Sequence, residues 1–250
     1  MSKRKTIYIS EVKPEFKSTY SNSKLGGLKQ RILAVSYMPA HEPLRYKDGR
    51  LVTDCMGTCG GVNCKGCMQG CYAIRTVRQY ESACYNRIAN TLHMRQDIDA
   101  HFEAIKAECI KRNITTLRYT EAGELETFRQ FVKVVELAQE LPEMEVYLYT
   151  KNYPILRRFF ETDELPENMT VLVSIWGSVG VQEYNEFKDH DGIKCFVVNN
   201  DEIKADCNCP AYKLNSKGKV KRVNSDAVKC GNCRLCTRAK SVKVIKCLEH

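Results

Sequence analysis

The spacing of apolar residues changes near residue 114. From Ala73 to about Arg112 apolar side chains recur at helical spacing, and a break is expected near Gln96–Asp97. Beyond that point short apolar runs alternate with helical segments. The predicted strands are Thr115–Tyr119, Glu145–Tyr149, Val171–Ile175 and Lys194–Val198, and the predicted helices are Thr127–Glu140, Pro154–Phe160 and Tyr184–Phe187. This alternation predicts an α/β fold with a parallel sheet. Four strands are too few for a closed eight-stranded barrel, so we expect an open or partial (β/α) barrel-like sheet.

The N-terminal part is less regular. Thr6–Ile9 and Ile32–Tyr37 are predicted to be short strands separated by turns. We divide the chain into residues 1–54 with these strands and turns, 55–206 with a cysteine loop and the α/β part, and a cysteine-rich segment 207–247. Residues 248–250 resemble a tag remnant.

Cysteines gather in two groups, and these groups dominate the candidate chemistry. Seventeen residues of a glycine-rich loop hold Cys55, Cys59, Cys64, Cys67 and Cys71. The second group holds Cys207, Cys209, Cys230, Cys233 and Cys236. Thiolates at such short spacings are typical of iron–sulfur and other soft-metal sites. A disulfide framework is less favoured, because such frameworks belong to small secreted domains.

Spacing suggests how the two groups divide into ligand sets. We expect Cys59, Cys64, Cys67 and Cys71 to form one site and Cys209, Cys230, Cys233 and Cys236 the other, with Cys55 and Cys207 as substitutes. The run Cys-x2-Cys-x2-Cys after a remote Cys-Pro has ferredoxin-like spacing. The expected cofactor is therefore one or two iron–sulfur clusters of the [4Fe-4S] type, with zinc as the alternative. Cys84, Cys109, Cys195 and Cys247 are isolated and are expected to pack in the core.

Charge and composition indicate which kinds of partner and which cellular location to expect for this chain. Residues 211–247 contain eleven Lys or Arg and one acidic residue, whereas the whole chain has a net charge of +9. Two roles are open for such a segment: contact with nucleic acid, or compensation of the negative charge of a thiolate-bound cluster. No apolar run is long enough to span a membrane, and no hydrophobic signal core follows the basic N-terminus, so a cytoplasmic location is expected.

Polar residues follow each predicted strand of the α/β part. In parallel sheets ligands bind at the carboxyl ends of the strands. Glu121, Glu124, Lys151 and Trp176 are therefore a candidate ligand pocket. The sequence contains no phosphate-binding loop and no dinucleotide fingerprint, and His41, His93, His101 and His190 are scattered.

Several motifs in combination resemble the phage gene-product-88 domain family, from about residue 20 to 236. They are Asn22-Ser-Lys-Leu-Gly, Gly57-Thr-Cys with Cys67-x3-Cys71-Tyr-Ala, Tyr149-Thr-Lys, and Cys209-Pro with Cys230-x2-Cys233-x2-Cys. Family members often carry Gly-Asp where this chain has Gly123-Glu124, and the preceding histidine is absent here. The resemblance implies a phage or prophage origin, a location in the cytoplasm of the host cell, and metal-binding cysteines. It does not imply a particular activity.

A radical-SAM enzyme is the neighbouring class, since it combines an iron–sulfur cluster with a partial barrel. Its usual Cys-x3-Cys-x2-Cys motif is broken twice: Val62 follows Cys55-x3-Cys59, and Ile74 follows Cys67-x3-Cys71, where the third cysteine should stand. Three hypotheses therefore stand. They are an iron–sulfur protein with a redox, structural or sensing role, a radical-SAM-like enzyme with atypical ligands, and a zinc-containing nucleic-acid-binding protein.

Overall fold

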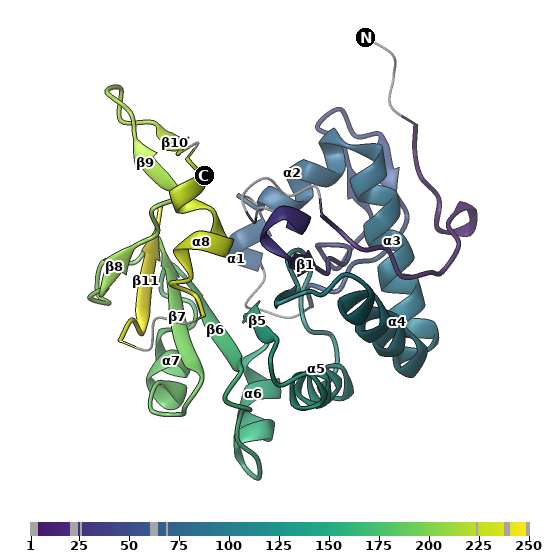
Figure 1. The fold of residues 1–250 in the computed structure, drawn as a ribbon. Coiled ribbons are helices and arrows are strands. Elements are labelled where there is room, and N and C mark those ends of the chain that lie inside the picture. Colours follow the sequence, from purple (N-terminus) through teal and green to yellow (C-terminus); the bar gives the residue numbers. More distant parts are fainter. Residues whose placement is uncertain are drawn as a thin grey trace.

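A seven-stranded parallel sheet forms the centre of the protein (Figure 1). The computed structural model describes residues 5–20, 25, 27–60, 65–68, 70–223, 225–237 and 241–248. In spatial order the strands are β1 (Ile32–Ala34), β4 (Thr116–Tyr119), β5 (Glu145–Thr150), β6 (Met169–Trp176), β7 (Ile193–Val198), β11 (Val244–Cys247) and β8 (Cys207–Asn208). Each neighbouring pair is parallel. The predicted α/β fold is confirmed, and the sheet is open, with β1 and β8 at its edges.

Helices cover one face of this sheet. They are α4 (Ile98–Lys111), α5 (Phe128–Glu140), α6 (Tyr153–Phe160) and α7 (Val181–Phe187). Their apolar sides pack on alternate strand residues such as Leu117, Leu148 and Val173, which are fully buried. Strand side chains alternate between the two faces, so the residues between these positions point to the opposite face. Figure 1 shows the four helices ranged along one side of the strands, away from α8 (Cys230–Cys233).

The predicted helical stretch before β4 consists of three helices in the structure. These are α2 (Tyr72–Gln79), α3 (Glu81–Gln96) and α4. The expected break is confirmed at Asp97, whose side chain accepts a hydrogen bond from the Ala100 amide at 2.9 Å and so caps α4. A second break at Tyr80, where the backbone is extended, was not predicted because no glycine or proline marks it.

The N-terminal strand prediction is partly wrong. Residues 6–9 make only a single bridge, between Ile7 and Thr53, and the chain continues into a 3-10 turn at Ile9–Glu11. A small hairpin of β2 (Leu44–Arg45) and β3 (Leu51–Thr53) lies nearby. The strand predicted at Ile32–Tyr37 is confirmed in its first half as β1.

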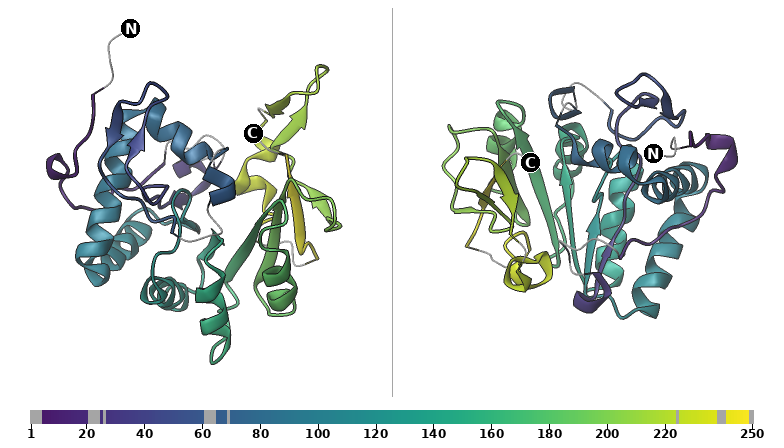
Figure 2. Two further views of the ribbon diagram at one scale, coloured as in Figure 1. Left: turned by 180° about the vertical axis from the view of Figure 1, so that it is seen from behind. Right: turned by 90° about the horizontal axis from the view of Figure 1, so that it is seen from above.

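The C-terminal segment belongs to the main sheet. Ile245 of β11 pairs with Phe196 of β7 on one side and with Cys207 of β8 on the other. Between β8 and β11 the chain forms a hairpin of β9 (Tyr212–Leu214) and β10 (Val220–Arg222), a 3-10 turn at Asp226–Val228, and α8. The hairpin stands out from the rest of the molecule in the left view of Figure 2. Residues 207–237 therefore return over the sheet face that the large helices leave open.

The first cysteine loop lies at the carboxyl end of β1 and β4. Thr58 donates its backbone amide to the Met38 carbonyl at 2.9 Å, and the Thr58 hydroxyl accepts the Glu124 amide at 2.8 Å. Gly57 is pressed against backbone: a Cβ there would lie 2.2 Å from the Pro39 carbonyl oxygen. The short helix α1 (Lys65–Met68) follows within this loop. No helix in the described ranges is long and apolar enough to cross a lipid bilayer.

Candidate metal centre

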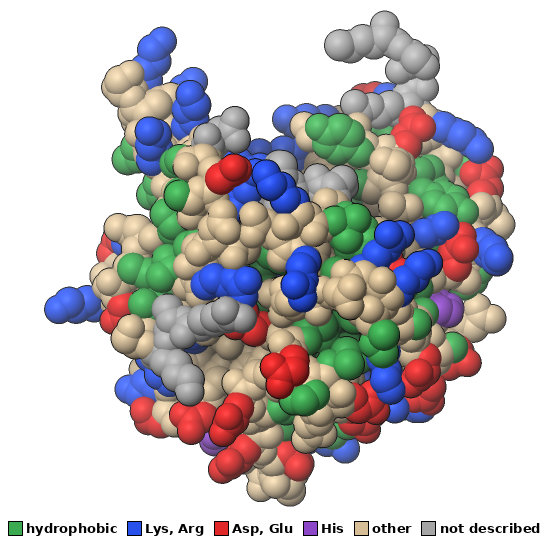
Figure 3. Space-filling model, viewed as in Figure 1, with side chains coloured by type: hydrophobic (Ala, Val, Ile, Leu, Met, Phe, Trp, Pro, Cys, Tyr) green, Lys and Arg blue, Asp and Glu red, His purple; other side chains and the backbone are tan. Residues whose placement is uncertain are grey.

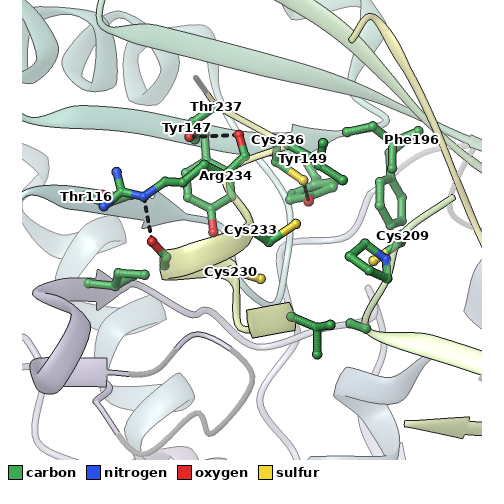
Figure 4. Close-up of a pocket in the computed structure, with 17 residues that line it drawn as sticks. Thr116, Tyr147, Tyr149, Phe196, Cys209, Cys230, Cys233, Arg234, Cys236 and Thr237 are labelled. Carbon is green, nitrogen blue, oxygen red and sulfur yellow. Dashed lines mark hydrogen bonds between the residues drawn. The ribbon is translucent and has the colours of Figure 1, made fainter. Parts of the chain in front are cut away.

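Four cysteines of the second group line one cavity (Figure 4). Cys209 follows β8, Cys230 and Cys233 lie on α8, and Cys236 lies in the turn after it. The floor of the cavity is the open face of the sheet, with Tyr147, Tyr149, Phe196 and Ile245 among its residues. One of these cysteines belongs to the remote Cys-Pro and the other three to the Cys-x2-Cys-x2-Cys run. The fold therefore brings the two parts of the predicted ligand set to one cavity.

Two basic side chains hold the cysteine turn against the sheet. Arg234 forms an ion pair with Glu145, at the start of β5, with an Nη1 to Oε2 distance of 2.7 Å. Lys194 of β7 donates from Nζ to the carbonyls of Leu235 at 2.8 Å and Thr237 at 3.1 Å. These contacts place positive charge beside the thiols, which is the sign that thiolates favour.

Close packing also positions α8. A Cβ on Gly231 would lie 2.7 Å from Cβ of Gln30, so only glycine fits without displacement of that side chain. Gln30 lies just before β1, and Cys230 packs against Ile32 and Ala34. The first cysteine pair of the run is thereby fixed to the edge strand of the sheet.

Tyr149 connects the cavity to the sheet. Its hydroxyl donates a hydrogen bond to Sγ of Cys236, with an oxygen–sulfur distance of 3.0 Å. The Arg118 guanidinium stacks over the Tyr149 ring at 4.9 Å, and Phe196 meets the same ring edge-on at 5.0 Å. Burial raises the pKa of the Cys236 thiol to about 12, and the Tyr149 hydrogen bond acts in the opposite direction. The thiol is therefore protonated at neutral pH unless a metal displaces its proton.

The donor set fits a thiolate-bound metal, although the side chains do not yet surround one. Four thiols against aromatic and apolar walls are the ligands that iron–sulfur clusters and structural zinc prefer. Among the residues that the structure describes, however, no three His, Cys, Asp or Glu side chains are placed to hold a metal ion.

The first cysteine group lies elsewhere. Of its predicted ligands, Cys64 is outside the described residues, and Cys59, Cys67 and Cys71 are partly exposed. None of these three lines the cavity of the second group. Cys55, a predicted substitute, is fully buried in an apolar cluster, and burial raises the pKa of its thiol to about 11. Cys207, the other substitute, packs against the same apolar cluster as Cys209 and Cys236, formed by Tyr147, Leu172 and Ile245.

Comparison with known proteins decides the family. The family model described as Gene product 88 matches residues 15–241. The chain belongs to the Gene product 88 family. No curated protein and no solved structure matches the chain.

The Gene product 88 match spans both cysteine groups and all strands of the central sheet except β11, which begins at Val244. Family membership confirms the resemblance seen in the cysteine motifs. The matched region also contains the four residues predicted to form a ligand pocket at the carboxyl ends of the strands.

Two of those four residues, Glu124 and Lys151, contact each other in this Gene product 88 protein. Glu124 is buried and accepts hydrogen bonds from the Thr150 hydroxyl at 2.7 Å and from the Lys151 amide at 2.8 Å. Lys151 in turn donates from Nζ to the Ser174 hydroxyl at 2.9 Å. Burial is the main cause that raises the pKa of Glu124, against these hydrogen bonds. Glu124 and Lys151 therefore tie β4, β5 and β6 together at the rim.

Glu121 belongs to a different cluster. Its carboxylate accepts a hydrogen bond from the Ser36 hydroxyl at 2.9 Å and forms a buried ion pair with Arg87 at 3.5 Å. The Tyr72 hydroxyl, next to Cys71, donates to the Glu121 carbonyl. Trp176 is partly exposed at the end of β6. None of the four predicted pocket residues lines the described cavity, so their role as a ligand site stays a prediction.

A histidine pair, buried at His101 and partly exposed at His93, was not predicted from the sequence. His93 of α3 and His101 of α4 face each other, with their Nδ1 atoms 3.1 Å apart. His101 also shares a hydrogen bond with the Tyr37 hydroxyl at 2.9 Å, and Tyr37 donates to Tyr119 at 2.6 Å. Burial lowers the pKa of His101 to about 3. The two histidines are eight residues apart on different helices, and this spacing alone does not predict that their side chains meet.

Proposed function

We propose that this Gene product 88 protein is an iron–sulfur protein with a redox, structural or sensing role. Its principal centre is held by Cys209, Cys230, Cys233 and Cys236. One observation carries this proposal: four thiols from two separate parts of the C-terminal segment line the same cavity. The open sheet is the scaffold of this centre and corresponds to a portion of a (β/α) barrel, whose inner face forms the floor of the cavity. The protein acts in the reducing cytoplasm of the host cell.

Several features of the cavity suit a cluster. Its walls are aromatic and aliphatic, which excludes water and stabilises thiolate-bound iron. Lys194 lies close to the cysteine turn and offsets negative charge there. The spacing Cys-x2-Cys-x2-Cys is typical of [4Fe-4S] ligation. When bound, such a cluster would supply one-electron chemistry or a rigid cross-link.

A second cluster in the 59–71 loop remains part of the proposal. Cys59, Cys64, Cys67 and Cys71 have the required ligand types, and the loop is anchored at the carboxyl ends of β1 and β4. Because the described cysteines of this loop do not line the second group's cavity, two centres are favoured over one shared centre.

The proposal is tested by metal and sulfide analysis of protein purified without oxygen. We expect iron and acid-labile sulfide in comparable amounts, a brown colour, and broad absorption near ~400 nm from sulfur-to-iron charge transfer. Stoichiometric zinc without sulfide would establish the zinc alternative. Protein that contains neither metal after expression with both metals supplied would refute a metal centre altogether.

The second candidate function is nucleic-acid binding by residues 211–247, with zinc or a cluster in a structural role. The observation that favours it is the projecting basic hairpin β9–β10, visible at the edge of the molecule in Figure 3. Lysine and arginine contacts to phosphates release condensed counterions, so binding should weaken steeply with salt. A gel-shift series with DNA and RNA at increasing salt tests this candidate, and no shift at low salt refutes it.

A further inference from the structure

The basic C-terminal segment divides into two parts with different environments. Outside the hairpin, several cations are already used within the protein: Arg234 pairs with Glu145, Lys246 with Asp201, and Lys229 with Asp226. Within residues 212–222 there are five Lys or Arg and no acidic residue. Lys213, Lys217, Lys219 and Lys221 form no ion pair with any side chain that the structure describes. The uncompensated charge is therefore concentrated in the hairpin.

The strand register places three lysines on one face of this hairpin. Lys213 lies directly opposite Lys221, and Leu214 lies opposite Val220. Residues two apart share a face, so Lys219 joins Lys213 and Lys221, whereas Leu214, Val220 and Arg222 take the other face. Like charges directly opposite each other destabilise a β-pair. A polyanion against this face would remove that repulsion.

The hairpin has a defined shape that suits a groove. It is a two-stranded antiparallel ribbon closed by a tight turn, in which the Asn215 side chain accepts hydrogen bonds from the Lys217 and Lys219 amides, each at 2.9 Å. Gly218 takes the left-handed backbone conformation that this turn needs, with φ of +69°. Figure 1 and the left view of Figure 2 show the ribbon projecting clear of the body. The major groove of a duplex admits a ribbon of this kind.

Side-chain chemistry favours a duplex over a single strand. Proteins that bind single strands stack bases on exposed aromatic rings. The ribbon has one aromatic residue, Tyr212, at its foot and on the face opposite the lysines. Lysine contacts to the phosphates of a duplex do not depend on the base sequence.

We propose that the β9–β10 hairpin is a nucleic-acid-binding arm, whose Lys213, Lys219 and Lys221 face contacts the phosphate backbone of a duplex. This inference rests on the second candidate function and places it on three residues. Lys229, Arg234 and Lys246 of the same segment instead pair with acidic side chains of the protein. The arm's foot is also a wall of the cysteine cavity, since Cys209, Pro210 and Ala211 line it. A metal centre in that cavity would fix the position of the hairpin without itself contacting the nucleic acid.

The test compares two triple variants of the full chain. The first is Lys213→Gln, Lys219→Gln and Lys221→Gln in the arm. The matched control, Lys47→Gln, Lys111→Gln and Lys188→Gln, removes the same charge from exposed positions elsewhere. Binding to a short fluorescein-labelled DNA duplex is followed by anisotropy over a series of salt concentrations. Metal content is measured on the same preparations, so that loss of the metal centre is not mistaken for loss of the arm.

We expect the arm variant to bind at least about tenfold more weakly at low salt, and its log–log salt slope to fall by about 2 to 3, since each phosphate contact contributes about 0.9. The control should bind like the natural chain. Equal affinity of the two triple variants would overturn the inference while leaving nucleic-acid binding intact. No duplex binding by the natural chain would overturn both. Tighter binding to a single-stranded oligonucleotide than to the duplex would refute the groove assignment.

Discussion

The Tyr149 hydroxyl donates a hydrogen bond to the sulfur of Cys236 at 3.0 Å, and this contact links the central sheet to the candidate metal centre. Tyr149 lies in β5, and its ring is held between Arg118 and Phe196. The donor therefore has a fixed position, as groups that orient metal ligands usually have. Tyr147 is a second tyrosine of β5 that lines the same cavity.

Removal of this hydroxyl should weaken metal retention. We expect Tyr149→Phe to lower the metal affinity of the protein about 10-fold or more, because partners of metal ligands typically contribute 10–100-fold. Competition with a chelator, followed by absorbance, measures the change. Tyr147→Phe is the matched control and should retain the natural affinity. Equal affinities for the two variants would show that the hydrogen bond to Cys236 does not support the centre.

Much of the fold follows from local patterns, whereas the cavity does not. The helix Phe128–Glu140 and the strand Met169–Trp176 have clear helical or β-branched apolar signals and were predicted within a few residues. β11 was missed because Val244–Cys247 is short and follows a basic stretch, and only its pairing with β7 identifies it. The cysteine spacing was visible in the sequence. The approach of Tyr149 and Lys194 to that run depends on contacts between residues far apart in the chain.

Gly231 should be intolerant of even one added carbon. In Gly231→Ala the new methyl would lie 2.7 Å from Cβ of Gln30, so α8 must shift away from β1. We expect a loss of about 1–3 kcal/mol in the free energy of unfolding, typical of overpacking, together with lower metal content. Because Gln30→Gly removes the opposing Cβ, Gly231→Ala should cost little stability in that background, so that most of the loss is recovered in the double variant. Urea denaturation of the single and double variants measures it, and no recovery would contradict the proposed contact.

His101 should make stability depend on pH between about 6.5 and 3. Burial and the neighbouring His93 lower the pKa of His101 from 6.5 to about 3, so the unfolded chain binds a proton there that the folded protein excludes. The contribution is fully present above pH 6.5 and is lost as pH falls toward 3, by up to about 1.4 kcal/mol per pH unit.

The natural chain should therefore lose more stability on acidification than His101→Gln, which has no imidazole to protonate. His190→Gln is the control, because His190 stacks on Phe160 away from this network. Denaturation midpoints at several pH values give the difference. A parallel pH dependence for the natural chain and His101→Gln would rule out His101 as the source.

The broken ligand triads predict an absence of radical chemistry. Cleavage of S-adenosylmethionine needs an iron without a cysteine ligand, whereas each of the proposed ligand sets supplies four thiolates. We expect no 5′-deoxyadenosine when the dithionite-reduced protein is incubated with S-adenosylmethionine and the mixture is separated by chromatography. Turnover above a protein-free control would instead favour the radical-SAM-like alternative, with a three-cysteine cluster in the 55–73 loop.

The central claim is that Cys209, Cys230, Cys233 and Cys236 together hold a thiolate-bound metal, and X-ray absorption at the metal edge observes those ligands directly. The sample is anaerobic protein from iron-replete cells, compared with a variant in which the four cysteines are replaced by serine. We predict iron with a shell of sulfur neighbours only, and loss of that signal, or its reduction to the share of the 59–71 loop, in the variant. Retention of the full iron content per protein with an unchanged sulfur shell in the variant, or a natural chain with only nitrogen and oxygen neighbours, would contradict the account.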